Sequence, residues 1–136
     1  MGEVIPLPCG GSTLVIAEQT GVAWYGCSIR ADSRDTYLGA ENRAYLLTHL
    51  QNVVEPEEPT TSAAGVIEGQ RVRWVLSLAE VHHSLYVRDG PAEVKTLYWQ
   101  DRDARTVCVS RLSPSNVLEW RSTLNMALGS SASMPQ

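Results

Sequence analysis

The sequence predicts an α+β fold, with antiparallel β-meanders of about seven to eight strands and two amphipathic helices in the order βββ-α-ββββ-α. Short segments in which apolar and polar residues alternate, separated by turn residues, occupy the stretches before residue 31 and between residues 65 and 112. Two longer segments, at residues 37–54 and 113–128, instead carry apolar residues at helical spacing. The two helices are expected to pack on one face of the longer meander.

Three short strands are expected in the N-terminal part of the chain, at Glu3–Cys9, Thr13–Glu18 and Val22–Arg30. The first two are joined by Gly10-Gly11 and the second two by Thr20-Gly21, and glycine readily adopts the positive φ of tight hairpin turns. This part of the chain is therefore expected to form a meander of its own.

The first helix is predicted from Tyr37 to Val54, with Asp35 or Thr36 as its N-cap. Its apolar residues fall on one side of the helix: Ala40, Leu46, Leu47, Leu50, Val53 and Val54. Arg43 lies within this stripe near the start of the helix, where it could reach water or a carboxylate. The proline- and glutamate-rich stretch at residues 55–62 cannot bury enough apolar surface and is expected to be an exposed loop.

The central stretch of the sequence, Val72 to Leu112, reads as a series of antiparallel strands. A two-residue turn at Ala79-Glu80 would place Trp74 opposite Leu85. Neither turn residue favours positive φ, so one long strand with a β-bulge at this point stays open as the alternative. A four-residue loop at residues 89–92 then places Val87 opposite Val94, and a last loop is expected at residues 101–104.

This register assigns each strand residue to one of two faces, because side chains alternate along a strand. The apolar face, expected beneath the helices, holds Val72, Trp74, Leu76, Leu85, Val87 and Val109. The opposite face is basic and aromatic, and its candidate binding residues are Arg73, His82, Tyr86, Arg88, Lys95, Leu97 and Trp99. The sequence leaves undecided whether that face is open or is covered by the N-terminal meander or by a second subunit.

The last helix is expected to begin at Ser113-Pro114, since serine is a favourable N-cap and proline suits the first helical position. Gly129 should end this helix. Residues 1–128 are therefore predicted to form a single α+β domain, followed by a disordered C-terminal tail at residues 129–136.

The composition is that of a globular protein with a net charge of −4, which argues against nucleic acid as the partner. The three cysteines have no paired spacing, which suggests buried thiols in a reducing compartment. No signal peptide and no run of about 18 apolar residues is visible. We therefore expect a soluble cytoplasmic protein that does not contact a membrane.

The His82-His83 pair is the most evident candidate for chemistry. Adjacent strand residues point to opposite faces, so the two rings cannot easily bind one metal ion. Cys108 and His82 would lie two strands apart, roughly 10 Å by the interstrand spacing, which is too far for a direct hydrogen bond. We therefore predict no catalytic residues, no metal site and no cofactor, and the sequence leans towards a non-enzymatic protein.

The predicted order of elements resembles that of the PsbP-type fold, and this resemblance implies a binding or accessory protein. From the basic and aromatic face we expect a small non-enzymatic chaperone, adaptor or immunity-type protein that binds a protein partner on an open sheet face. A homodimer is a second way to use that face. The alternative is a small-ligand-binding protein or an enzyme with a pocket between the sheet and the helices, lined by Arg43, His83 and Tyr98.

Overall fold

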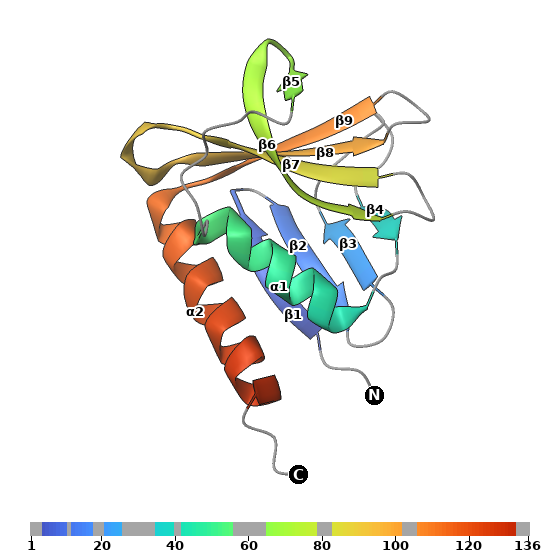
Figure 1. Cartoon of the computed structure of the whole chain (residues 1–136), viewed down its shortest axis with the longest axis vertical. Helices are drawn as coiled ribbons and strands as arrows, with labels where there is room; N and C mark the ends of the chain where they lie inside the picture. The colour runs from blue at the N-terminus through green and yellow to red at the C-terminus, as the bar shows by residue number, and fades with distance from the viewer. Residues whose placement is uncertain are drawn as a thin grey trace.

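A computed structural model describes residues 4–10, 12–17, 21–25, 35–39, 42–55, 65–78, 83–101 and 106–132. Within these ranges the chain has an α+β fold built from antiparallel sheets and two helices, which confirms the predicted fold class. Figure 1 shows a five-stranded sheet across the upper part of the molecule, with both helices and a four-stranded sheet below it.

The four-stranded sheet contains β1 (Val4–Cys9), β2 (Ser12–Ala17), β3 (Gly21–Tyr25) and β4 (Asp35–Gly39), paired in that order. Cys9 pairs with Ser12, so a two-residue turn connects β1 to β2, and Gly10 in that turn has a φ of 63°. Glycine adopts this left-handed conformation without the clash that a Cβ atom would cause. The predicted turn and the first three predicted strands are confirmed, although the described part of the third strand ends at Tyr25.

The first helix, α1 (Arg43–Val54), begins at Arg43 and not at Tyr37 as predicted. The segment before it forms β4, which pairs with β3. Asn42 is the N-cap, and its side chain accepts a hydrogen bond from the Tyr45 backbone N–H at 3.2 Å. The predicted start is wrong because pairing with another strand overrides a local helical pattern.

The five-stranded sheet contains β5 (Gly65–Ile67), β6 (Gln70–Leu78), β7 (His83–Asp89), β8 (Lys95–Asp101) and β9 (Thr106–Leu112), paired in that order. All neighbouring strands are antiparallel. Leu78 pairs with His83, so β6 and β7 form a hairpin as predicted, and its connecting residues 79–82 lie outside the described residues. The alternative of one long strand through Ala79 and Glu80 is therefore wrong. The predicted two-residue turn at Ala79-Glu80 is wrong too, because it placed Trp74 opposite Leu85, whereas the structure pairs Trp74 with Tyr86.

A β-bulge does occur in β6, but it lies at Val75 and not at the turn. Leu76 pairs with Leu85, and Trp74 pairs with Tyr86, the residue that follows Leu85 in β7. Two steps along β6 therefore match one step along β7, so Val75 is an extra residue in β6. The insertion reverses the faces of the earlier residues: Trp74 is 44% exposed, and Arg73 is buried with 9% of its surface exposed. The prediction that Trp74 packs beneath the helices while Arg73 faces outwards is wrong.

The pairing of β7 with β8 also differs from the predicted register. The predicted four-residue loop placed Val87 opposite Val94, but the structure pairs Val87 with Leu97. The connection contains a 3-10 turn, Pro91–Glu93, in which Ala92 has a φ of 56°. The shift is an odd number of residues, so it moves every side chain of β8 to the other face of the sheet.

The five-stranded sheet has an inner face toward the core and an outer face away from it, as assigned from strand pairing. The inner face consists of Arg73, Leu76, Leu78, His83, Leu85, Val87, Asp89, Lys95, Leu97, Trp99, Asp101, Ser110 and Leu112. The outer face consists of Val72, Trp74, Ser77, Ser84, Tyr86, Arg88, Thr96, Tyr98, Gln100, Val107, Val109 and Arg111. Three members of the predicted apolar face lie on the inner face as expected: Leu76, Leu85 and Val87. The other three lie on the outer face: Val72, Trp74 and Val109, of which Val72 is buried.

One hydrophobic core joins the inner face to both helices and to the four-stranded sheet. The four-stranded sheet contributes Ile5, Leu7, Cys9, Leu14 and Ile16. The helix α1 contributes Leu46, Leu47, Leu50, Val53 and Val54, five members of its predicted apolar stripe. The second helix, α2 (Pro114–Ala132), contributes Val117, Trp120 and Leu124. Trp120 also ties α2 to β1, because its Nε1 donates a hydrogen bond to Pro8 O at 2.6 Å.

The helix α2 starts where the sequence analysis placed it and runs further than predicted. Ser113 Oγ accepts a hydrogen bond from the Asn116 N–H at 3.2 Å, and Asn116 Oδ1 accepts one from the Ser113 N–H at 3.4 Å. The helix continues through Gly129, whose φ is not positive, to its last residue. The predicted tail is therefore helical at residues 129–132, and residues 133–136 lie outside the described ranges.

Candidate binding surface

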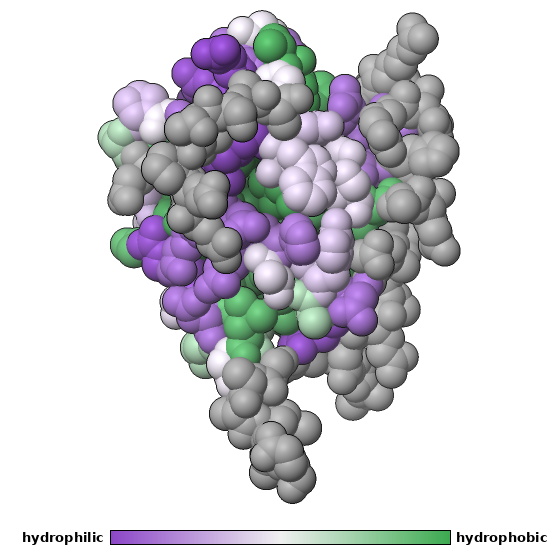
Figure 2. All heavy atoms as spheres, viewed as in Figure 1, coloured by the Kyte–Doolittle hydropathy of each residue, from purple (hydrophilic) through white to green (hydrophobic). Residues whose placement is uncertain are grey.

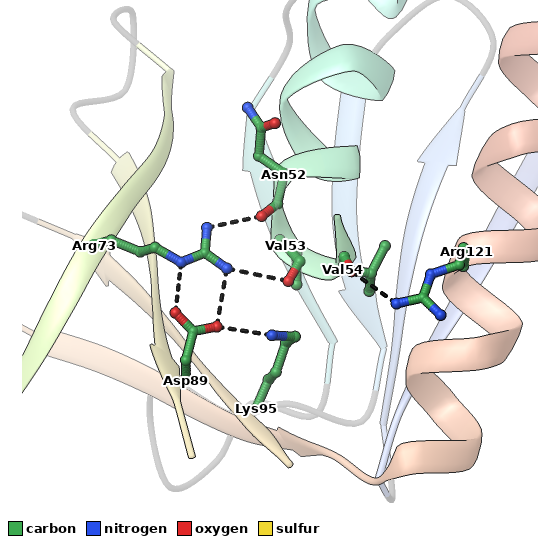
Figure 3. A network of polar contacts seen from close by, with 7 residues as sticks. All are labelled: Asn52, Val53, Val54, Arg73, Asp89, Lys95 and Arg121. Carbon is green, nitrogen blue, oxygen red and sulfur yellow. Dashed lines mark hydrogen bonds and ion pairs between the residues drawn. The ribbon is translucent and has the colours of Figure 1, made fainter. Parts of the chain in front are cut away.

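Arg73 of β6 forms a polar network on the inner face of the sheet (Figure 3). Its guanidinium holds Asp89 in a two-point ion pair, with Nε 2.7 Å from Oδ2 and Nη2 3.0 Å from Oδ1. The same group donates hydrogen bonds to Asn52 O at 2.7 Å and to Val53 O at 3.2 Å. These carbonyls belong to the last turn of α1, where carbonyl oxygens have no donor within the helix. Arg73 therefore caps α1 from a neighbouring strand.

Lys95 and Arg121 add to the contacts at the end of α1. Lys95 Nζ lies 2.8 Å from Asp89 Oδ1, and Arg121 of α2 donates from Nη2 to Val54 O at 3.0 Å. Positive charge is favourable here because the C-terminus of a helix is the negative end of its dipole. Burial alone would raise the pKa of Asp89, but the hydrogen bonds and charges of Arg73 and Lys95 outweigh burial and hold that pKa below its ordinary value. Two of the predicted binding residues thus stabilise the fold.

Leu97 and Trp99, two further predicted binding residues, are completely buried in the core. The Trp99 ring packs edge to face against His83, with the ring centroids 6.4 Å apart. His83 Nε2 lies 3.3 Å from Asp101 Oδ2. His82 lies outside the described residues. The residues predicted to form the binding face therefore do not share one face of the sheet.

The residues of the alternative pocket, Arg43, His83 and Tyr98, are not brought together either. His83 lies on the inner face opposite Asp101, while Tyr98 lies on the outer face opposite Tyr86, so the sheet separates the two side chains. Arg43 is half-buried at the start of α1. In the part of the chain that the structure describes, no group of three or more histidine, cysteine, aspartate or glutamate side chains could hold a metal ion.

Cys9 is the cysteine whose side chain the structure describes, and it is completely buried in the core. Its Sγ–H donates to Leu7 O at 3.4 Å. Burial raises the pKa of this thiol to about 12. Because the thiolate is the reactive form of cysteine, Cys9 is not poised to act as a nucleophile at neutral pH.

The outer face carries two rows of residues that are aligned across the strands. The aromatic row runs from β6 to β9 and consists of Trp74, Tyr86, Tyr98 and Val109. The arginine row runs from β7 to β9 and consists of Arg88, Thr96 and Arg111. Trp74 and Val109, at the two ends of the aromatic row, are 44% and 43% exposed. Tyr98 and Thr96, in the middle of the two rows, are buried.

The outer face differs in charge from the chain as a whole. The chain has a net charge of −4, but the described positions of the outer face include Arg88 and Arg111 and no aspartate or glutamate. Neither of these arginines has a carboxylate partner among the described residues, whereas Arg73 and Arg121 both do. Arg88 and Tyr86 are the two predicted binding residues that the structure places on this face.

Trp74 is held by contacts along the edge of β6. Its Nε1 donates a hydrogen bond to Ser77 Oγ at 2.8 Å, and Ser77 Oγ lies 2.9 Å from Ser84 Oγ. The His49 ring of α1 meets Trp74 edge to face with the centroids 5.8 Å apart, and the Tyr45 ring lies 4.1 Å from His49. Figure 2 shows pale residues, which are of intermediate hydropathy, gathered at the surface above α1. The aromatic surface therefore continues past β6 onto α1.

The Tyr45 hydroxyl covers part of the free edge of β6. It donates a hydrogen bond to Ser77 O at 3.2 Å and accepts one from Ser77 N at 3.4 Å. Both backbone groups of Ser77 therefore point away from β7, which makes Ser77 and Ser84 a pair without mutual backbone hydrogen bonds. Uncovered strand edges readily pair with other chains, and this contact blocks such pairing. The backbone groups of Ser77 at this side of the sheet are therefore already occupied.

Sequence reasoning missed Trp74, Val109 and Arg111 as members of the outer face. Glycine often marks a bulge, but the bulge in β6 falls at a valine. A signal was nevertheless present, because the residues from Trp74 to Leu76 are three consecutive apolar residues. Strict alternation cannot place all three on one face, so an irregularity in this stretch could have been expected.

No helix in the described part of the chain is long and apolar enough to cross a membrane. Comparison of the chain with models of known protein families, with curated proteins and with solved structures gives no match. The resemblance in element order to the PsbP-type fold therefore gains no support, and the geometry of the outer face is the basis for a functional proposal.

Proposed function

We propose that this protein is a small non-enzymatic binding or accessory protein, of the chaperone, adaptor or immunity type, that holds a protein partner on the outer face of its five-stranded sheet. The observation that carries this proposal is the aromatic row with the arginine row beside it. Tryptophan, tyrosine and arginine are the residue types that most often contribute large shares of the binding energy at protein interfaces. The compartment we propose is the cytoplasm, which suits the buried free thiol of Cys9.

The exposure of the aromatic row supports a surface for a partner. The core is completed by the inner face, so the outer-face residues Trp74 and Val109 are not required to fill it. Both are more than 40% exposed at the two ends of the aromatic row, and large apolar side chains left at the surface are candidate contacts for a partner. Trp74 is also fixed by its hydrogen bond to Ser77 Oγ, which lowers the conformational entropy that it would lose on binding.

The other uses of the sheet receive less support. A ligand pocket built on His83 and Tyr98 has no geometric basis, because the two side chains lie on opposite faces. A homodimer through the outer face would bring Arg88 and Arg111 of each copy toward the same arginines of the other, and like charges at an interface repel. A different protein is therefore the favoured partner.

Site-specific photo-crosslinking in cells that produce the protein tests this proposal. A benzophenone amino acid at Val109, on the outer face, should capture the partner. The same amino acid at Leu118, which is 60% exposed on α2, should not capture it. Capture from Leu118 alone, or from neither position, would contradict the proposal.

The captured partner also allows a quantitative test with two alanine variants. Isothermal titration calorimetry should show that Trp74→Ala weakens binding by about tenfold or more, whereas Leu118→Ala changes it by less than about twofold. Circular dichroism of both variants serves as the control for folding. Equal affinities of the two variants would overturn the role of the outer face.

A further inference from the structure

We infer that the partner presents an acidic amphipathic helix that lies across the strands of the outer face. Its carboxylates would meet the arginine row, and its apolar side chains would lie on the aromatic row. This inference rests on the proposed function and adds the chemistry of the partner. It follows from the charges left without a carboxylate in the described part of the chain, from their number and from their spacing.

Three basic residues of the sheet and of α2 already have a carboxylate partner. Arg73 and Lys95 share the carboxylate of Asp89, and Arg121 contacts Glu55 with Nε 3.2 Å from Oε1. The two arginines of the arginine row have no such carboxylate among the described residues, and the outer face offers none. A partner with carboxylates would form ion pairs with these arginines, because its negative charge is complementary to their positive charge.

The number of arginines favours an acidic protein over nucleic acid. Proteins that bind nucleic acid tightly commonly contact about six to ten phosphates, and each contact adds to the salt dependence of binding. The arginine row supplies two arginines, and the chain as a whole has a net charge of −4. Long-range repulsion between the negatively charged chain and a polyanion would therefore oppose the binding free energy that two arginine–phosphate contacts could supply.

The spacing of the arginines favours a helix over an extended strand. Arg88 and Arg111 flank Thr96 on neighbouring strands, so two interstrand spacings, roughly 10 Å, separate their backbones. Residues seven apart in a helix lie about 10.5 Å apart on nearly the same side, whereas side chains on one face of a strand repeat at about 6.8 Å. Carboxylates seven residues apart in a helix would therefore reach both arginines.

The position of the aromatic row fits the same helix. Tyr86 and Val109 each lie two residues along the strand from an arginine of the arginine row, which is a separation of about 7 Å. A helix is about 10–12 Å wide with its side chains, so one helix can cover both rows. Such a helix would carry acidic residues along one flank and apolar residues along the adjacent flank.

Two synthetic helical peptides of identical composition provide the test. The first carries two glutamates seven residues apart beside a stripe of leucines, and the second carries the same glutamates five residues apart, on opposite sides of the helix. Binding to the isotope-labelled full chain is followed by NMR chemical shifts. We expect the first peptide to bind at least about fivefold more tightly than the second and to shift the amides of Tyr86 and Val109.

Two exposed arginines of the same sheet give a matched pair of variants. Arg111 belongs to the arginine row, whereas Arg71 on β6 does not. Arg111→Gln should weaken binding of the first peptide by roughly threefold to tenfold, and Arg71→Gln should leave it within about twofold. Equal binding of the two peptides, or equal effects of the two substitutions, would overturn the inference.

A 15-nucleotide oligothymidine is the probe for the competing class of partner. Binding of this oligonucleotide more tightly than the first peptide would overturn the inference in favour of nucleic acid. Failure of the peptide test with capture from Val109 retained would refute the acidic helix but leave the proposed function standing. Loss of capture from Val109 would instead refute the proposed function.

Discussion

The inner and outer faces of the five-stranded sheet carry similar residue types in different environments. On the inner face, Arg73 and Lys95 contact the carboxylate of Asp89, and the His83 ring lies next to that of Asp101. On the outer face, Arg88 and Arg111 have no carboxylate partner among the described residues. Each face also has a tryptophan, and Trp99 is completely buried whereas Trp74 is 44% exposed.

Desolvation explains this difference between the faces. A charge that is removed from water costs several kcal/mol unless a partner compensates it, so the inner face can hold Arg73 only together with Asp89 and the carbonyls of α1. An arginine that keeps its hydration needs no such partner to be compatible with the fold. Basic residues on the two faces of this sheet therefore lie in two different environments. Arg73 and Lys95 inside stabilise the fold, whereas Arg88 and Arg111 outside have no carboxylate partner among the described residues.

The largest expected difference between the faces is between their two tryptophans. Trp99→Ala should lower the free energy of unfolding by about 3–5 kcal/mol, because it leaves a cavity in the core. Trp74→Ala should lower it by about 1 kcal/mol, since 44% of this residue is already exposed to water. Urea denaturation of both variants measures these changes. Equal losses in the free energy of unfolding would contradict the burial of Trp99 and the exposure of Trp74.

A smaller effect is expected when the buried arginine is compared with an exposed one. Arg73→Ala should lower the free energy of unfolding by about 3 kcal/mol, because it leaves Asp89 and the last carbonyls of α1 without their donors. Arg111→Ala should change it by less than about 0.5 kcal/mol. The same denaturation experiment compares the two variants. A loss for Arg111→Ala as large as that for Arg73→Ala would show that the outer arginine also stabilises the fold.

The smallest expected effect concerns pH. The pKa of Asp89 is below its ordinary value in the folded chain, so its ionised form contributes stability above the unfolded pKa of about 4. This contribution is lost as the pH falls from there through the folded pKa. Wild type should therefore exceed Asp89→Asn in stability most clearly near neutral pH, and the difference should narrow below about pH 4. A difference that does not change with pH would contradict the ion pair with Arg73 and Lys95.

Local signals in the sequence located most of the elements. The Gly10-Gly11 turn, the Ser113 cap and the apolar stripe of α1 each depend on neighbours within a few residues, and the structure confirms all three. The start of α1 was wrong because β4 depends on pairing with β3. Tyr86 and Arg88 were placed on the correct face of the sheet because the phase of β7 was predicted correctly.

The sequence by itself determined the α+β class, the hairpin of β6 and β7 and the presence of arginine and aromatic residues on alternating strands. Only the tertiary structure decided which of those residues face the core. The physical reason is that strand faces alternate with a period of two, so the single extra residue at Val75 and the odd shift between β7 and β8 each exchange inside for outside. Local propensity hardly distinguishes the predicted strand register from the observed one. The observed register buries Trp99 and lets Arg73 cap α1, and these tertiary contacts favour it.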